Sequence, residues 1–120
     1  MSQIRAVLRS TALRTEDPAE LLTRLDEHVQ YFLPDTMATA LCGILNPAAT
    51  TLHTSSAGHL PPILAAPHDA ATIVTIPPDL PLGVKSGRPR HSIHVPLPRG
   101  FVLCFYTDGL VERRGVVVDD

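Results

Sequence analysis

Apolar residues recur at helical spacing in two stretches near the amino terminus. In the first stretch one side of the expected helix carries Ile4, Val7, Leu8, Thr11 and Ala12, and the arginines fall mostly off that side. The second stretch opens with Asp17 as an N-cap, Pro18 at the first helical position and Glu20 at the third, a capping-box-like start. Its apolar stripe consists of Leu21, Leu22, Leu25, Val29 and Phe32, and Pro34 ends it. The pattern predicts two packing helices, each with one buried face.

After the second helix the pattern changes to short strands and turns. Of the 12 prolines only Pro18 precedes Pro34, so long helices are not expected beyond that point. Residues 37–45 form a near-continuous apolar run that ends at Asn46-Pro47, and residues 51–57 follow as a hairpin partner. Further strands are expected at residues 63–66, 73–76, 91–95 and 101–106, with a stiff loop at 77–84. Two helices followed by antiparallel strands predict an α+β fold, with the helices layered on a sheet.

Composition and charge narrow the class of protein. A chain of 120 residues is expected to be a single domain, and its net charge of -2 gives no basic footprint for nucleic acid. No apolar run approaches the roughly 18 residues of a membrane span, and no signal peptide is seen, so we expect a cytoplasmic protein without a membrane partner. Cys42 and Cys104 lie in apolar runs and are expected to be buried, reduced thiols.

One carboxylate stands at a chemically suggestive position. Asp108 follows the apolar run of residues 101–106, which we interpret as a strand buried on both faces. A carboxylate at the end of such a strand lies at the rim of a sheet, where it can face a ligand or a metal ion. Gly109 lets the backbone turn sharply directly afterwards. The alternative is that Asp108 simply caps a helix beginning near Leu110.

Six histidines raise the question of a metal site. His91 and His94 are three residues apart in an expected strand, so they point to opposite faces and cannot share one ion. Ordinary surface or hydrogen-bonded roles are also expected for His28, His53 and His68. His59 differs, because Gly58 precedes it and a rigid Leu-Pro-Pro follows. Such a loop suits either a site residue or a ring bonded to a loop carbonyl. There is no zinc-type Cys/His spacing, Walker loop or serine elbow.

Three motifs occur in the order typical of one family: residues 57–64 (AGHLPPIL), 80–84 (LPLGV) and 106–112 (YTDGLVE). With residues 18–22 (PAELL) and 37–40 (MATA), they make the whole chain resemble the SpoIIE/RsbU branch of the metal-dependent protein serine/threonine phosphatases (PPM). The resemblance implies an α-β-β-α sandwich that holds two Mn²⁺ or Mg²⁺ ions. It also implies that a metal-activated water attacks phosphoserine or phosphothreonine without a covalent enzyme intermediate.

The resemblance assigns roles to individual residues. Asp108 matches the family's Asp-Gly metal ligand, which agrees with a carboxylate at the sheet rim. A further acidic ligand follows in the family, and Asp119 or Asp120 is the candidate for it. Gly58 and His59 match a loop near the site and are expected to position it, as is Gly109. Ser56 departs from the pattern, because many relatives carry Asn there.

The resemblance also points to a missing feature. Relatives carry an Asp-Val-x-Gly-His-Gly-like segment before the first helix, and its aspartate bridges both metals. Residues 1–16 hold no carboxylate except Glu16. We therefore expect residues 1–120 to be the carboxyl-terminal two-thirds of a phosphatase domain, with doubtful activity alone. The expected substrate is a phosphorylated anti-sigma-factor antagonist, and a sensor domain is possible upstream. The alternative is a non-catalytic relative that binds a phosphoprotein or a partner domain.

Overall fold

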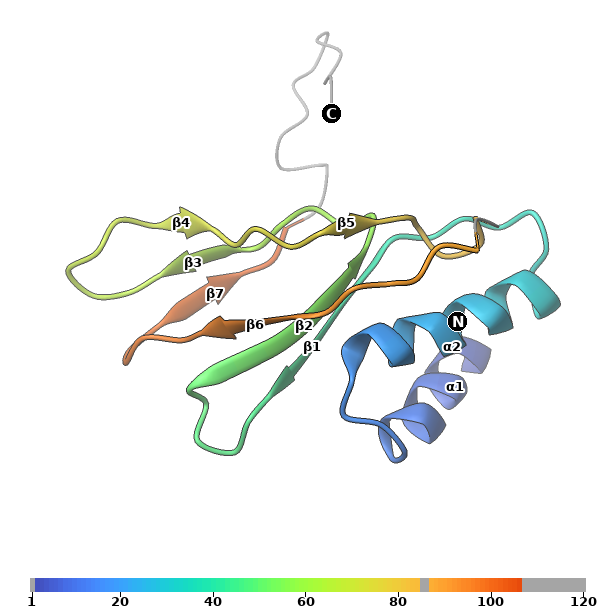
Figure 1. Cartoon of the computed structure of the whole chain (residues 1–120), viewed down its shortest axis with the longest axis horizontal. Helices are drawn as coiled ribbons and strands as arrows, with labels where there is room; N and C mark the ends of the chain where they lie inside the picture. Colours follow the sequence, from blue (N-terminus) through green and yellow to red (C-terminus); the bar gives the residue numbers. More distant parts are fainter. Residues whose placement is uncertain (1, 85–86, 107–120) are drawn as a thin grey trace, which may run out of the picture. The chain divides into compact units, whose positions relative to one another are not determined.

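The computed structural model describes residues 2–84 and 87–106, with side chains from residue 5 onward (Figure 1). The chain divides into two compact units. One consists of Met1–His59 with Ile76–Leu97, and the other of Leu60–Thr75 with Pro98–Asp120. The first unit holds both helices and the larger sheet, and the second holds a three-stranded sheet.

Two helices open the first unit, as predicted. Helix α1 spans Ser2–Ala12 and helix α2 spans Pro18–Phe32. The Asp17 carboxylate accepts the Ala19 amide at 3.0 Å, which satisfies one of the free donors at the start of α2. Leu33 donates its amide to the Val29 carbonyl at 2.9 Å before the chain leaves the helix.

The apolar stripe of α2 is buried as predicted, except at its last member. Leu21, Leu22, Leu25 and Val29 are buried, together with Ala57 and Leu82 from other segments, and these six residues form the core cluster. The prediction for Phe32 was wrong, because its side chain is 58% exposed. It lies in the last turn of α2, where it packs against the rings of His28 and Tyr31 rather than against the sheet.

The larger sheet is built around one central strand. Strands β1 (Ala40–Leu45) and β2 (Thr51–Ala57) form the predicted antiparallel hairpin. The turn between them is held by Asn46, whose Oδ1 accepts the amides of Thr50 and Thr51 at 2.8 and 3.0 Å. On its other side β2 pairs with β6 (Ile93–Pro96) and, in parallel, with β5 (Pro78–Asp79).

Helix α2 packs on β1 and β2, and α1 packs on α2 (Figure 1). Strand β2 therefore lies inside the unit, and five of its residues are buried. Its buried hydroxyl groups are paired with carbonyls of neighbouring segments: Thr54 donates to Cys42 at 2.8 Å and Ser55 to His91 at 2.6 Å. The two-residue strand β5 lies in the stretch predicted to be a stiff loop.

The second unit contains strands β3 (Ile63–Ala65), β4 (Thr72–Ile73) and β7 (Val102–Cys104). Strand β3 lies between the other two and pairs antiparallel with both. The prediction of a strand buried on both faces was wrong for β7, because Val102 and Cys104 are exposed and only Leu103 is half-buried. Alternation of side chains places Val102 and Cys104 on one open face. The burial predicted for Cys104 was therefore wrong as well.

The α+β fold class is confirmed, with two amino-terminal helices followed by largely antiparallel strands. Among the described residues no helix is both long and apolar enough to cross a membrane.

Candidate functional site

The Gly58–His59 turn leaves the end of the central strand β2. Gly58 has φ +68°, in the left-handed region that glycine adopts without a steric penalty. The turn is fastened by Ser56, whose hydroxyl accepts the His59 amide at 3.1 Å and donates to the His59 carbonyl at 3.3 Å. Because Ser56 is only 2% exposed, this double contact ties the backbone of His59 to the sheet. A serine thus serves at the position where the resemblance led us to expect asparagine.

The first four residues of the second motif, Leu80–Gly83, are held in place by contacts within the first unit. Leu82 is buried in the core cluster, and its backbone exchanges hydrogen bonds with Ala38 at 3.1 and 2.8 Å. Gly83 has φ +92°, and a Cβ atom there would lie 1.9 Å from the Thr36 carbonyl oxygen. Only glycine fits at this position, because both the backbone conformation and the space exclude a side chain.

The two motifs touch each other. A Cβ atom on Gly58 would lie 2.7 Å from Cγ of Pro81, so the turn packs directly against the second motif. We call the Gly58–His59 turn and the Leu80–Gly83 segment together the loop junction. The beginning of the first motif, residues 57–59, and the second motif are therefore brought together in the first unit, whereas residues 60–64 belong to the second unit.

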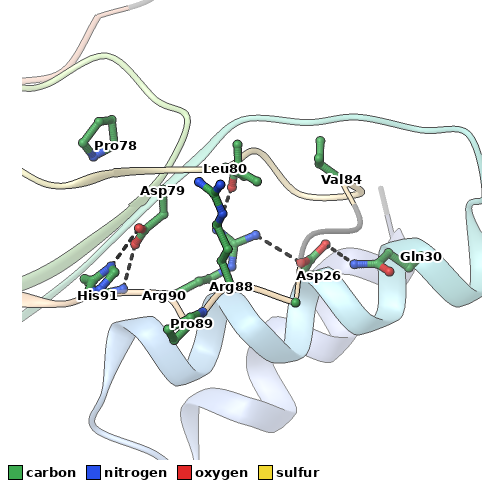
Figure 2. A pocket seen from close by; sticks show the side chains of 11 residues that line it. Asp26, Gln30, Pro78, Asp79, Leu80, Val84, Arg88, Pro89, Arg90 and His91 are labelled. Atoms are coloured by element: carbon green, nitrogen blue, oxygen red, sulfur yellow. Dashed lines mark hydrogen bonds and ion pairs between the residues drawn. The ribbon is translucent and has the colours of Figure 1, made fainter.

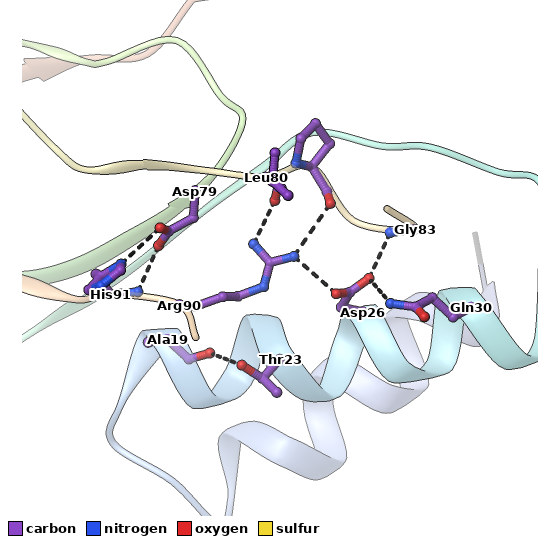
Figure 3. Close-up of polar contacts among 10 residues, drawn as sticks. Ala19, Thr23, Asp26, Gln30, Asp79, Leu80, Gly83, Arg90 and His91 are labelled. Atoms are coloured by element: carbon purple, nitrogen blue, oxygen red, sulfur yellow. Dashed lines mark hydrogen bonds and ion pairs between the residues drawn. The ribbon is translucent and has the colours of Figure 1, made fainter. Parts of the chain in front are cut away.

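A buried ion pair anchors the loop junction to helix α2 (Figure 3). Arg90 Nη2 lies 3.1 Å from Asp26 Oδ2, with the two side chains 7% and 16% exposed. Arg90 also donates to the Leu80 carbonyl at 2.7 Å and to the Pro81 carbonyl at 3.4 Å. The other carboxylate oxygen of Asp26 accepts the Gly83 amide at 2.7 Å and the Gln30 side chain at 3.0 Å.

The electrostatic state of Asp26 follows from these contacts. Burial acts to raise the pKa of the Asp26 carboxyl, but hydrogen bonds from Gln30, Gly83 and Arg90 and the charge of Arg90 together hold it below its ordinary value. The carboxylate is therefore ionised at neutral pH, as the ion pair requires.

A cavity of about 530 Å³ lies beside this network (Figure 2). The acidic, basic and imidazole side chains in its wall are Asp26, Asp79, Arg88, Arg90 and His91. Asp79 accepts the His91 amide at 2.7 Å and lies 2.9 Å from the Nδ1 atom of its ring. Both carboxylates of the wall are thus bound to cationic or imidazole partners, so neither is presented as an open metal ligand.

The histidines fall into separate environments. His91 precedes strand β6 and pairs with Asp79, whereas His94 lies within β6. The hydrogen-bonded role expected for His53 is confirmed, and its ring also stacks on His94 across strands β2 and β6, with centroids 4.0 Å apart. Its ring nitrogens contact the Glu16 carbonyl and the Ser92 hydroxyl at 3.2 and 3.1 Å.

The predicted metal ligands are not placed. Asp108, Asp119 and Asp120, with Gly109, lie outside the described residues. Within residues 2–84 and 87–106 there is no group of three or more histidine, cysteine, aspartate or glutamate side chains that could hold a metal ion. The metal site accordingly stays a prediction from the resemblance.

Neither Asp26 nor Arg90 was predicted from the sequence as a site residue. One signal was available for Asp26, which lies next to Leu25 and three residues before Val29 and so borders the buried stripe of α2. No local signal marks Arg90, whose partner is 64 residues away.

The chain is similar to a known protein family in sequence and to a solved structure in fold. The sequence profile of Stage II sporulation protein E (SpoIIE) matches residues 1–120. A crystal structure of the RsbU and RsbW domains of Rv1364c from Mycobacterium tuberculosis superposes with a TM-score of 0.80 and 32% sequence identity. The match covers 96% of this chain and 32% of that chain, so this chain spans about a third of its length.

Proposed function

The chain belongs to the SpoIIE family, within the SpoIIE/RsbU-type PPM phosphatases, and we propose that it serves as part of a metal-dependent protein serine/threonine phosphatase domain. The observation that carries the proposal is the match of the SpoIIE family over residues 1–120, a range that includes all three motif regions. The loop junction supports it, because two of those motifs pack against each other through Gly58 and Pro81. In this proposal residues 1–120 form the carboxyl-terminal two-thirds of the domain.

The proposed metal ligands are Asp108 and either Asp119 or Asp120, which offer the hard oxygen atoms that Mn²⁺ and Mg²⁺ prefer. Two bound ions would activate a water molecule and neutralise charge on the phosphoryl group. Gly109 would let the backbone turn directly after Asp108. Gly58 and His59 act as positioning residues, and their backbone is already fastened by Ser56.

The proposed substrate is phosphoserine or phosphothreonine on a regulatory protein, such as an anti-sigma-factor antagonist. It is supported by the similar Mycobacterium tuberculosis chain, which contains an RsbU and an RsbW domain. In the same proposal the protein works in the bacterial cytoplasm, downstream of a sensor domain in a longer polypeptide.

The second candidate is a non-catalytic module that binds a phosphoprotein or a partner domain. Residues 1–120 contain no Asp-Val-x-Gly-His-Gly-like segment, which supplies the bridging aspartate in relatives, so in either case we expect little turnover from these 120 residues alone.

Hydrolysis of an aryl phosphate in the presence of Mn²⁺ tests the proposal. The assay compares the chain with a form extended at its amino end by a strand that carries the Asp-Val-x-Gly-His-Gly segment. We expect activity in the extended form, its loss in Asp108→Asn, and its retention in Asp69→Asn, a control at an exposed turn carboxylate. If the extended form neither hydrolyses the aryl phosphate nor binds Mn²⁺ by calorimetry, the phosphatase proposal is overturned in favour of the binding module.

A further inference from the structure

The Leu80–Gly83 segment is irregular, yet its backbone groups are held by side chains from two distant elements. On one side, Arg90 reaches the Leu80 and Pro81 carbonyls at 2.7 and 3.4 Å. A guanidinium suits this task because its planar fork directs several donors at fixed angles. With only 7% of the side chain exposed, water does not readily replace these contacts.

On the other side, helix α2 holds the same segment through Asp26. One carboxylate oxygen accepts the Gly83 amide at 2.7 Å and the other contacts Arg90 at 3.1 Å. The ion pair therefore holds both ends of the segment. Arg90 bonds the carbonyls of Leu80 and Pro81, and Asp26 bonds the amide of Gly83. Helix α2 is itself anchored by its buried apolar stripe. The Leu80–Gly83 segment is therefore attached to a helix that is held firmly in the core.

The position of the segment determines the space left for the neighbouring turn. Gly58 approaches Pro81 so closely that an added Cβ atom would lie 2.7 Å from Cγ and 3.1 Å from Cδ of the ring. A shift of Pro81 toward the turn would displace Gly58, and a shift away would leave a void beside it. The backbone of His59 follows directly and would move with Gly58.

From this chain of contacts we propose that Arg90, paired with Asp26, is a positioning residue that sets the conformation of the Gly58–His59 turn through Pro81. The inference rests on the proposed function for its relevance to phosphate hydrolysis, but the contacts themselves do not depend on it. A purely structural ion pair would stabilise the fold without controlling the conformation of the turn. The amide signals of Gly58 and His59 distinguish this structural role from the positioning role.

The test uses two-dimensional ¹H–¹⁵N spectra and amide exchange of the chain and its variants. In Arg90→Gln we expect shifted amide signals for Gly58 and His59, and at least a tenfold faster exchange of the Gly83 amide. We expect Arg90→Lys to behave in the same way, because a lysine keeps the charge but cannot reach Asp26 and both carbonyls with one planar fork. Arg24→Gln, which removes the exposed ion pair with Glu20 on the same helix, should leave all three signals unchanged.

Unchanged Gly58 and His59 signals in both Arg90 variants, with only a lower melting temperature, would overturn the positioning role. Should the Arg90 variants not fold, the isosteric Asp26→Asn decides by the same signals at Gly58, His59 and Gly83. In the extended, active form, Arg90→Gln should lower kcat several-fold more than it raises KM for the aryl phosphate, and Arg24→Gln should change neither. Spectral changes without any phosphatase activity in the wild type would overturn the proposed function and leave the positioning role standing.

Discussion

The sheet packed under helix α2 and the three-stranded sheet of β3, β4 and β7 carry different parts of the family motifs. The first holds the loop junction, whose segments are tied to buried strands, to the core cluster and to the Asp26–Arg90 pair. The second holds β7, the strand that leads toward Asp108, and keeps Ile73 and Val102 each 63% exposed. The positioning elements of the proposed site are therefore held by contacts within the first unit, and these contacts do not involve the strand that precedes the predicted metal ligand.

The largest expected change in unfolding free energy comes from replacing one glycine in each unit by alanine. Gly83→Ala combines a left-handed backbone with a Cβ atom 1.9 Å from the Thr36 oxygen, so we expect a loss of about 3–5 kcal/mol in unfolding free energy. Gly100→Ala in the second unit has φ +75° and only a 3.1 Å approach to Pro67, and should cost about 1–2 kcal/mol. Urea denaturation compares them, and equal costs would show that the loop junction is not rigid.

Valine truncation compares packing in the two units with the same chemical change, at Val29 in helix α2 and at Val102 in strand β7. Val29 is fully buried in the core cluster, so Val29→Ala should cost about 2–3 kcal/mol through lost burial and a cavity. Val102→Ala, at a 63% exposed position, should stay within about 0.5 kcal/mol of the wild type. Thermal and denaturant unfolding measure both, and a large cost at Val102 would mean that the open face of β7 is covered in solution.

The local features of the first unit were predictable because they depend on neighbouring residues. Asp17 as a cap, the α2 stripe and the Asn46-Pro47 hairpin all follow from short-range patterns. The Asp26–Arg90 pair was not predictable, since its partners are 64 residues apart and only the folded chain brings them together. An apolar run such as that of β7 reports strand formation, but not whether both faces will be covered. That is why its burial was overestimated.

The ion pair of the first unit predicts a pH dependence of stability. The folded-state pKa of Asp26 lies below its ordinary value of 3.8, so as pH falls the unfolded chain takes up this proton first. The contribution of Asp26 is complete above about pH 5 and is lost as pH falls through the folded-state pKa. We expect Asp26→Asn to be less stable than the wild type by about 1–2 kcal/mol at pH 7, with the difference vanishing in acid. A difference independent of pH would contradict the ion pair.

The smallest expected effect is a difference in the rate at which the two thiols, Cys42 and Cys104, are modified. This rate reports how exposed each thiol is and requires no substitution. Burial, and then the charge of Asp17, raise the pKa of the Cys42 thiol, so less thiolate is available for reaction. Cys104 lies exposed on β7. Iodoacetamide at pH 8 should therefore modify Cys104 well before Cys42, as followed by mass spectrometry of peptides. Faster modification of Cys42 would show that β1 opens more readily than β7.

We infer that the loop junction is held in place by its own unit more firmly than the strands of the three-stranded sheet are held together. Two backbone hydrogen bonds of nearly equal length test it: Leu82 to Ala38 at 2.8 Å and Val74 to Pro62 at 2.9 Å. We would measure hydrogen–deuterium exchange of the Leu82 and Val74 amides by NMR, because exchange reports local opening. We expect the Leu82 amide to exchange at least about tenfold more slowly than the Val74 amide. Equal rates, or slower exchange at Val74, would contradict it.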